Sequence, residues 1–136
     1  NYVQGDQIDK DAFQSYVLAE RLQRQGKRSE AASFFRSVVD VYPETSIADD
    51  AAFRRAQLTL ELGEYTKTVE LLLAIQGSPL GDLATVMTGE VYDRYLFNSS
   101  EAEVWYFKVL EEYPESLLAE PVRYRLREIT KRDELN

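Results

Sequence analysis

The chain has 136 residues, of which 44% are hydrophobic and 29% charged, a balance typical of a globular domain that can bury a core. It contains no cysteine and no histidine, which excludes thiolate nucleophiles, disulfides, Cys/His zinc sites and imidazole bases. Its net charge of −8 opposes binding to a phosphate backbone. No apolar run approaches the roughly 18 residues of a membrane span, so neither nucleic-acid binding nor membrane insertion is expected.

Helical patterns punctuated by glycine and proline follow one another along the chain. Residues 1–10 are polar, and we expect a flexible N-terminal segment there. The apolar spacing predicts about seven helices, over residues 11–25, 29–42, 46–62, 66–76, 81–97, 100–113 and 117–130. Residues 131–136 are expected to form a polar tail. No segment shows strand alternation between hairpin turns, so the predicted fold class is all-α.

The stretch Ser29–Pro43 is the most informative, because the chain repeats it without a gap as Ser100–Pro114. The pairs in register are Ser29/Ser100, Glu30/Glu101, Ala31/Ala102, Val38/Val109, Tyr42/Tyr113 and Pro43/Pro114, and beyond the proline Glu44/Glu115, Ala48/Ala119, Phe53/Tyr124 and Arg54/Arg125. Glycines and prolines also recur at a shorter, regular period, as they do in helical repeat proteins. We therefore predict three helix-turn-helix repeats, at about 11–43, 46–79 and 82–114, and a final single helix over 117–130.

Two local features of the third repeat carry further expectations. Gly89 lies in the middle of a predicted helix, where glycine costs roughly 1 kcal/mol relative to alanine, so a neighbouring helix is expected to approach closely. Trp105, Tyr106 and Phe107 are consecutive and cannot all face one way on a helix, so at least one should be exposed. We interpret Trp105 as a core residue, with an exposed partner anchor as the alternative.

Helix, glycine turn, helix and proline at this period resemble the tetratricopeptide repeat (TPR). In the first repeat the resemblance rests on Leu18, Ala19, Leu22, Gly26, Ala31, Phe35, Val38 and Pro43. In the second it rests on Ala56, Gly63 and Leu72, whereas Thr68 stands where alanine is expected. In the third it rests, with one residue of slippage in the loop, on Gly89, Tyr92, Ala102, Tyr106, Val109 and Pro114. The resemblance covers residues 11–130 and implies a TPR-like α-solenoid with a concave side.

A narrower resemblance concerns the segments Tyr42–Arg54 and Tyr113–Arg125. Each has Tyr-Pro-Glu, then alanine, then an aromatic-arginine pair, which looks like the repeats of bacterial cell-envelope proteins. Those proteins include the periplasmic Tol-Pal coordinator and the outer-membrane assembly lipoprotein. The resemblance favours the periplasm or cell envelope over the cytoplasm. The acidic segment around Glu111 and the arginine-rich final helix are interpreted as solvated faces, with an electrostatic docking patch as the alternative.

The TPR resemblance implies a partner-binding groove lined by the first helix of each repeat. The twelve residues it places there are Tyr16, Glu20, Gln23, Arg24, Phe53, Gln57, Leu60, Glu61, Val86, Glu90, Asp93 and Arg94. Such a mixture of anchors, amides and charges suits a peptide or a partner protein. The acidic groups favour a basic or neutral peptide over a clamp for a C-terminal carboxylate. Tyr16 and Phe53 could instead belong to the core between repeats.

The predicted function is a non-enzymatic protein–protein interaction scaffold, with a bacterial envelope assembly factor as its candidate context. The alternative is a ligand- or peptide-sensing regulatory module of a larger protein. No catalytic residue, metal site or cofactor is predicted. Neighbouring carboxylates such as Glu111 and Glu112 point apart on a helix, and no glycine-rich phosphate loop is present. Nothing in the sequence indicates an oligomeric state.

Overall fold

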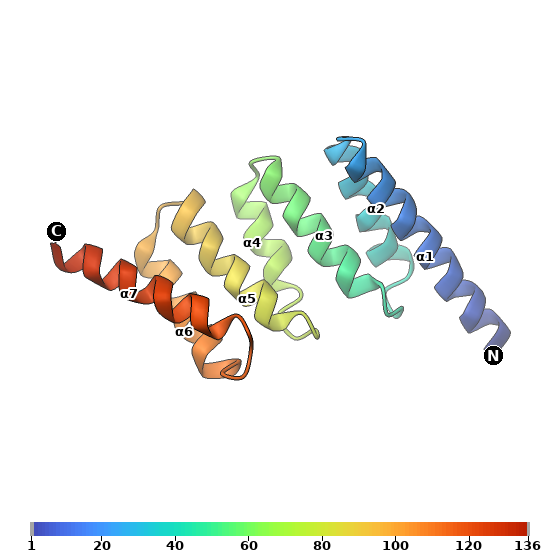
Figure 1. Cartoon of the computed structure of the whole chain (residues 1–136). Coiled ribbons are helices and arrows are strands. Elements are labelled where there is room, and N and C mark those ends of the chain that lie inside the picture. Colours follow the sequence, from blue (N-terminus) through green and yellow to red (C-terminus); the bar gives the residue numbers. More distant parts are fainter. Residues whose placement is uncertain (1, 136) are drawn as a thin grey trace. The chain divides into compact units, whose positions relative to one another are not determined.

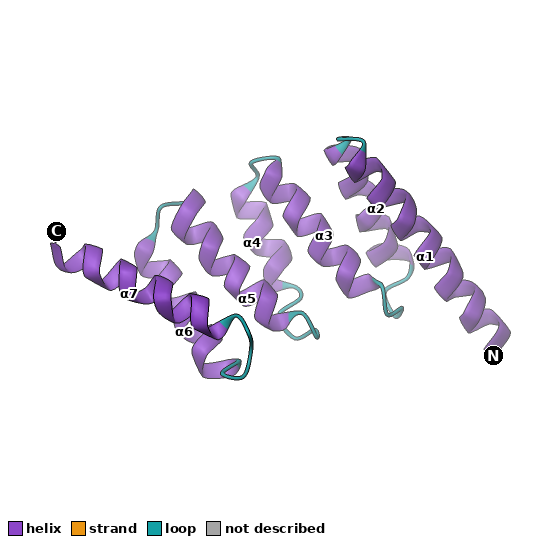
Figure 2. Cartoon of the chain, viewed as in Figure 1, coloured by secondary structure: helices purple, strands orange, loops and turns teal. Residues whose placement is uncertain are grey.

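The computed structural model describes the backbone of residues 2–135 and the side chains of residues 5–135. Within residues 2–135 the secondary structure consists of seven α-helices and one short π-helix, η1, with no strand (Figure 2). Their bounds are α1 Tyr2–Arg24, α2 Arg28–Val41, α3 Ala48–Glu61, α4 Tyr65–Leu73, α5 Gly81–Glu90, η1 Val91–Tyr95, α6 Ser99–Glu112 and α7 Ala119–Leu135. The predicted all-α class is confirmed.

The chain forms two compact units, and the division between them falls inside α4. The first unit, Asn1–Leu71, contains α1, α2, α3 and most of α4. The second unit, Leu72–Asn136, contains the end of α4 followed by α5, η1, α6 and α7; Figure 1 labels the α-helices. The domain limits of 11–130 and the limits of the three repeats stay predictions.

Helix α1 begins at Tyr2, so the helix predicted over residues 11–25 starts earlier than expected. The flexibility expected for residues 1–10 stays a prediction. Asn1 lies outside the described residues. Residues 2–10 contain no proline, and the lone Gly5 weakens a helix without ending it. The Gln7 side chain donates a hydrogen bond of 2.9 Å to the Asp11 carboxylate, one helical turn later, across the point where the helix was expected to begin.

Helix α7 also runs further than predicted, because residues 131–135 continue it to Leu135 instead of forming a tail. Asn136 lies outside the described residues. No glycine or proline follows Pro121, which occupies the first turn, where proline is tolerated. The Arg132 guanidinium donates a hydrogen bond of 2.6 Å to the Ser99 hydroxyl at the start of α6. The late residues of α7 are therefore tied to the helix before it.

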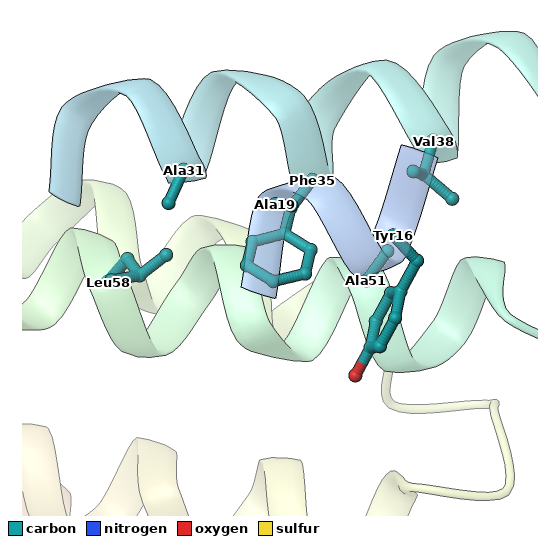
Figure 3. Close-up of a cluster of buried hydrophobic side chains, with 7 residues drawn as sticks. All are labelled: Tyr16, Ala19, Ala31, Phe35, Val38, Ala51 and Leu58. Atoms are coloured by element: carbon teal, nitrogen blue, oxygen red, sulfur yellow. The ribbon is translucent and has the colours of Figure 1, made fainter. Parts of the chain in front are cut away.

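A cluster of buried apolar side chains joins α1, α2 and α3 in the first unit. It contains Tyr16, Ala19, Ala31, Phe35, Val38, Ala51 and Leu58 (Figure 3). The rings of Tyr16 and Phe35 meet edge to face, with their centroids 5.2 Å apart. Small alanines from all three helices surround this aromatic pair, which lets the helix backbones approach each other closely.

The core of the second unit repeats that of the first at five of its seven positions. In the register that aligns Ser29–Pro43 with Ser100–Pro114, five residues of each core are counterparts, as the pairs Ala31/Ala102, Phe35/Tyr106, Val38/Val109, Ala51/Val122 and Leu58/Ile129. The second core is completed by Val86 and Leu126. The sequence repeat therefore corresponds to a repeated packing arrangement. In each unit the second helix of one repeat (α2 or α6) packs against the first helix after it (α3 or α7).

The expected close approach at Gly89 is present, and its partner is the ring of Tyr106 on α6. A Cβ atom on Gly89 would stand 2.6 Å from Cε1 and 2.7 Å from Cδ1 of that ring. One residue later α5 ends, and the chain continues as the π-helix η1 in place of the single helix predicted over 81–97. The glycine therefore makes room for an aromatic ring that a side chain would displace.

We predict opposite effects for alanine at two helical glycines. Gly89→Ala should lower the free energy of unfolding by about 1–3 kcal/mol, because overpacking against the Tyr106 ring outweighs the gain in helix propensity. Gly5→Ala is the matched control: no atom lies within 4 Å of its Cβ position, so stability should rise by up to about 1 kcal/mol. Urea denaturation measures both. Equal stabilisation by the two substitutions would contradict the packing described for Gly89.

Candidate functional site

Four of the twelve predicted groove residues are buried: Tyr16, Phe53, Val86 and Asp93. Tyr16 belongs to the core of the first unit, and Val86 to that of the second. In Figure 3 the Tyr16 ring faces the core while its hydroxyl points away from the other labelled side chains. The prediction that these side chains are open to a partner is wrong, and for Tyr16 the alternative of a core residue holds.

The other predicted residues of the first unit are at least partly exposed, and three of them already have partners. Arg54 on α3 donates hydrogen bonds of 3.2 Å to the Glu20 carboxylate and to the Gln23 amide oxygen, both on α1. Arg28, at the start of α2, forms an ion pair of 3.0 Å with Glu61. Within the described residues, Arg24, Gln57 and Leu60 form no side-chain hydrogen bond or ion pair. This face of the first unit is therefore polar and largely self-paired.

In the second unit, Asp93 lies at the centre of a buried polar cluster with Tyr106 and Arg125. Its carboxylate accepts hydrogen bonds of 2.7 Å and 2.9 Å from the Arg125 guanidinium, one on each oxygen. It also accepts a hydrogen bond of 3.0 Å from the Tyr106 hydroxyl. The Asp93 side chain is 1% exposed and that of Arg125 27%. The cluster joins η1, α6 and α7.

The cluster shifts the proton affinity of each of its members. The hydrogen bonds from Arg125 lower the pKa of Asp93 despite its burial, and Tyr106 adds to the effect. Burial, together with the Asp93 charge, raises the pKa of the Tyr106 hydroxyl. The same hydrogen bonds raise the pKa of Arg125. Both shifts favour an ionised Asp93 and a protonated Tyr106, which is the arrangement that their hydrogen bonds require.

Arg54 and Arg125 are counterparts in the repeat, and each forms an ion pair between two helices of its own unit. Each reaches from a first helix back to an acidic residue in the first helix of the preceding repeat. They differ in burial, because the side chains of Arg54 and Glu20 are 36% and 28% exposed. The pair in the second unit is therefore much better shielded from water and from salt.

The turn between η1 and α6 has a residue that the sequence analysis missed. Gly26 and Gly63 end α1 and α3 with positive φ angles of 79° and 82°. Phe97 takes the equivalent place after η1, with a φ of 51°, and it is the counterpart of Gly26 in the register of the repeat. Its side chain is 83% exposed. Comparing the repeats residue by residue would have found it, because a phenylalanine stands where the first repeat has its turn glycine.

The π-helix explains the extra residue in this turn. After α1, the Lys27 amide donates to the Leu22 carbonyl, five residues back, at 3.0 Å. After η1, the Asn98 amide donates to the Tyr92 carbonyl, six residues back, at 2.8 Å. The wider π-helical turn holds one more residue, which corresponds to the slippage seen in the sequence comparison. Glu90 and Arg94, the remaining predicted groove residues, are exposed on α5 and η1.

The three consecutive aromatic residues of α6 take three different environments. Tyr106 is buried, Trp105 is partly buried, and Phe107 is 52% exposed, in agreement with the expectation that at least one would be exposed. The Lys108 ammonium lies 4.8 Å from the centre of the Trp105 ring, a cation–π contact. The Trp105 indole N–H is buried without an acceptor in the described part of the chain.

Among the described residues, no group of three or more acidic side chains is arranged to hold a metal ion. None of the helices within these residues combines the length and the apolar character that crossing a membrane requires.

Comparisons with known proteins define the class of fold. No protein-family model matches the sequence, and no curated protein is similar to it. The structure is similar to a solved structure described as "MamA RS-1 ArsTM double mutant", a TPR-containing protein, with a TM-score of 0.68 and 19% sequence identity. The similarity covers 91% of this chain and 66% of that chain. The fold is therefore TPR-like and all-helical.

We predict that the two equivalent arginines contribute unequally to stability. Arg125→Met leaves the Asp93 carboxylate buried with one hydrogen-bond donor and should lower the free energy of unfolding by about 3 kcal/mol. Arg54→Met, the matched control, removes a pair that is about one-third exposed and should cost less than about 1 kcal/mol. Urea denaturation gives both values. The Asp93→Asn/Arg125→Met double variant should recover part of the loss; equal costs for the two arginines would refute the assignment.

Proposed function

We propose that the chain is a non-enzymatic protein–protein interaction scaffold that binds a peptide or a partner protein through its first helices. In the first unit the proposed contacts are Glu20, Gln23, Arg24, Gln57, Leu60 and Glu61. In the second unit they are Glu90 and Arg94, and we add Phe97 as the anchor. The buried residues Tyr16, Phe53, Val86 and Asp93 support these surfaces from beneath.

The observation that carries the proposal is the conformation and exposure of Phe97. An L-residue in the left-handed region costs roughly 1–2 kcal/mol, which glycine avoids at the two equivalent turns. A phenylalanine can offset that cost by burying its ring, but this ring is 83% exposed. Strained backbone and an exposed aromatic side chain at one position are typical of a site that is completed by a partner.

The charges of the proposed contact residues, taken in each unit separately, favour a neutral or basic peptide. The Asp93 charge is neutralised by Arg125, and Glu20 and Glu61 are paired with Arg54 and Arg28. Of the predicted acidic groups, Glu90 has no ion pair within the described residues. A peptide with an apolar side chain for Phe97 and uncharged or positive flanking residues fits this distribution better than one that ends in a bound carboxylate.

The proposed context in a bacterial cell envelope rests on the two Tyr-Pro-Glu segments. Both copies form the same turn, in which the amides of Thr45 and Ser116 donate to the carbonyls of Tyr42 and Tyr113 at 3.2 Å and 3.0 Å. This shared turn supports treating the two segments as one recurring motif, on which the resemblance to envelope proteins depends. Detection of the chain in the periplasmic fraction of its source cells would test the location.

We predict that Phe97→Gly abolishes partner capture without loss of stability. Glycine relieves the strained φ angle, so the free energy of unfolding should stay unchanged or rise by up to about 1 kcal/mol. Loss of an anchoring aromatic should weaken binding at least about tenfold. The measurement is crosslinked capture from source-cell lysate, quantified for each captured protein.

Leu117→Ala is the matched control, because Leu117 is 95% exposed and lies in another loop, before α7. A protein captured by the wild type and by Leu117→Ala, but not by Phe97→Gly, would support the proposal and identify the partner. Equal capture of every protein by all three forms would reject Phe97 as the anchor.

A further inference from the structure

The outer face of α6 and α7 forms a groove that the proposed first-helix surface does not use. Its cavity volume is about 750 Å³, and its lining comes from these two helices of the second unit. The apolar floor consists of Phe107, Leu110, Tyr124 and Leu126. Phe107 and Tyr124 are 52% and 62% exposed as whole residues, so two aromatic residues of this unit are open to solvent side by side in the lining.

Three cations follow this floor along α7. Arg123, Arg127 and Lys131 are spaced by four residues, so they form one row with a rise of about 6 Å between neighbours. Arg123 is paired with Glu120 in the first turn of the helix. Arg127 and Lys131 form no ion pair within the described residues. The lining also contains two carboxylates, Glu134 and Glu128, of which Glu128 is paired with Arg125 at 3.8 Å. A continuous basic row is unusual on a chain whose net charge is −8.

The equivalent face of α3 shows that this row is a local change in the repeat. In the register of the repeat, the counterparts of Arg123, Arg127 and Lys131 are Ala52, Ala56 and Leu60. On α3 this face is covered: Phe53, Ala56 and Thr59 are all buried. On α7 the corresponding Tyr124, Arg127 and Thr130 are exposed. At the three positions where α3 has a small or aliphatic residue, α7 has a cation. At the fourth position both helices have an aromatic residue, Phe53 on α3 and Tyr124 on α7.

We propose that this groove binds an acidic amphipathic helix of a partner protein. The groove follows α7 from residue 123 to residue 134, about 18 Å, which corresponds to roughly three helical turns. The apolar stripe of the partner helix would cover Phe107, Tyr124 and Leu126. Asp or Glu residues at four-residue spacing beside that stripe would meet Arg123, Arg127 and Lys131. The inference does not depend on the proposed function of the first helices.

Charge and shape favour this occupant over others. A phosphate backbone suits the cations but not the exposed aromatic floor, and the negative charge of the chain opposes it. A second copy of the same α7 face would bring two basic rows together. An acidic helix satisfies both features, because it covers the apolar floor and neutralises the two unpaired cations.

The test uses the full chain and two fluorescent helical peptides of about 14 residues, long enough to span the groove. Both carry the same leucine stripe; one has glutamate at every fourth flanking position and the other has lysine there. We expect the acidic peptide to bind at least about tenfold more tightly, with an affinity that falls as salt is raised. Binding is measured by fluorescence anisotropy.

Two sets of variants locate the binding. Arg127→Glu/Lys131→Glu should lower the affinity for the acidic peptide at least about tenfold. Lys10→Glu/Lys27→Glu makes the same change in net charge elsewhere and should have little effect on this affinity. Tyr124→Ala should lower it without changing the salt dependence. Phe97→Gly should bind the acidic peptide as the wild type does, which separates this site from the first-helix surface.

Four results would overturn the inference. They are equal binding of the two peptides, no effect of Arg127→Glu/Lys131→Glu, binding to anionic lipid vesicles without binding to the acidic peptide, and dimerisation of the wild type that Arg127→Glu/Lys131→Glu abolishes. The last two results would assign the groove to a membrane surface or to a second copy of the chain.

Discussion

The ion pair between Asp93 and Arg125 is the interaction on which the second unit depends most. The carboxylate is almost completely buried and has three hydrogen bonds, two from Arg125 and one from Tyr106. Asp93 lies in η1, so the pair holds the π-helix against α6 and α7. Because η1 leads into the turn that contains Phe97, the buried ion pair also fixes the residue that we propose as an anchor.

Comparison of the two units shows why such a pair is needed. At the centre of the first core, Phe35 packs edge to face against Tyr16 and brings no polar atom into it. At the same place in the second core stands Tyr106, whose buried hydroxyl requires an acceptor. Asp93 supplies that acceptor, and Arg125 then balances its charge. Gly89 makes the space for the ring. One aromatic position therefore accounts for several features of the later copy.

The sequence predicted the all-α class and most of the helices, because apolar spacing and the internal repeat can be seen directly in the order of the residues. It predicted the site only in part. A family resemblance indicates which helix lines a face but not its exact rotation, and one residue turns a side chain by about 100°. Tyr16 and Val86 therefore proved to be core residues. The role of Asp93 depends on Arg125, which is far from it in the sequence. The turn at Phe97 depends on a π-helix, and the one-residue slippage in the third repeat indicates an extra residue there but not a π-helix.

Site-resolved amide hydrogen exchange tests most directly whether the buried ion pair holds this turn. The two amides to compare are Asn98, which donates to Tyr92, and its counterpart Lys27, which donates to Leu22 in the first unit. In Asp93→Asn, we expect exchange at Asn98 to accelerate at least about tenfold, which corresponds to about 1.4 kcal/mol of lost local stability. Exchange at Lys27 should not change. An unchanged rate at Asn98, or equal acceleration at both amides, would contradict this account.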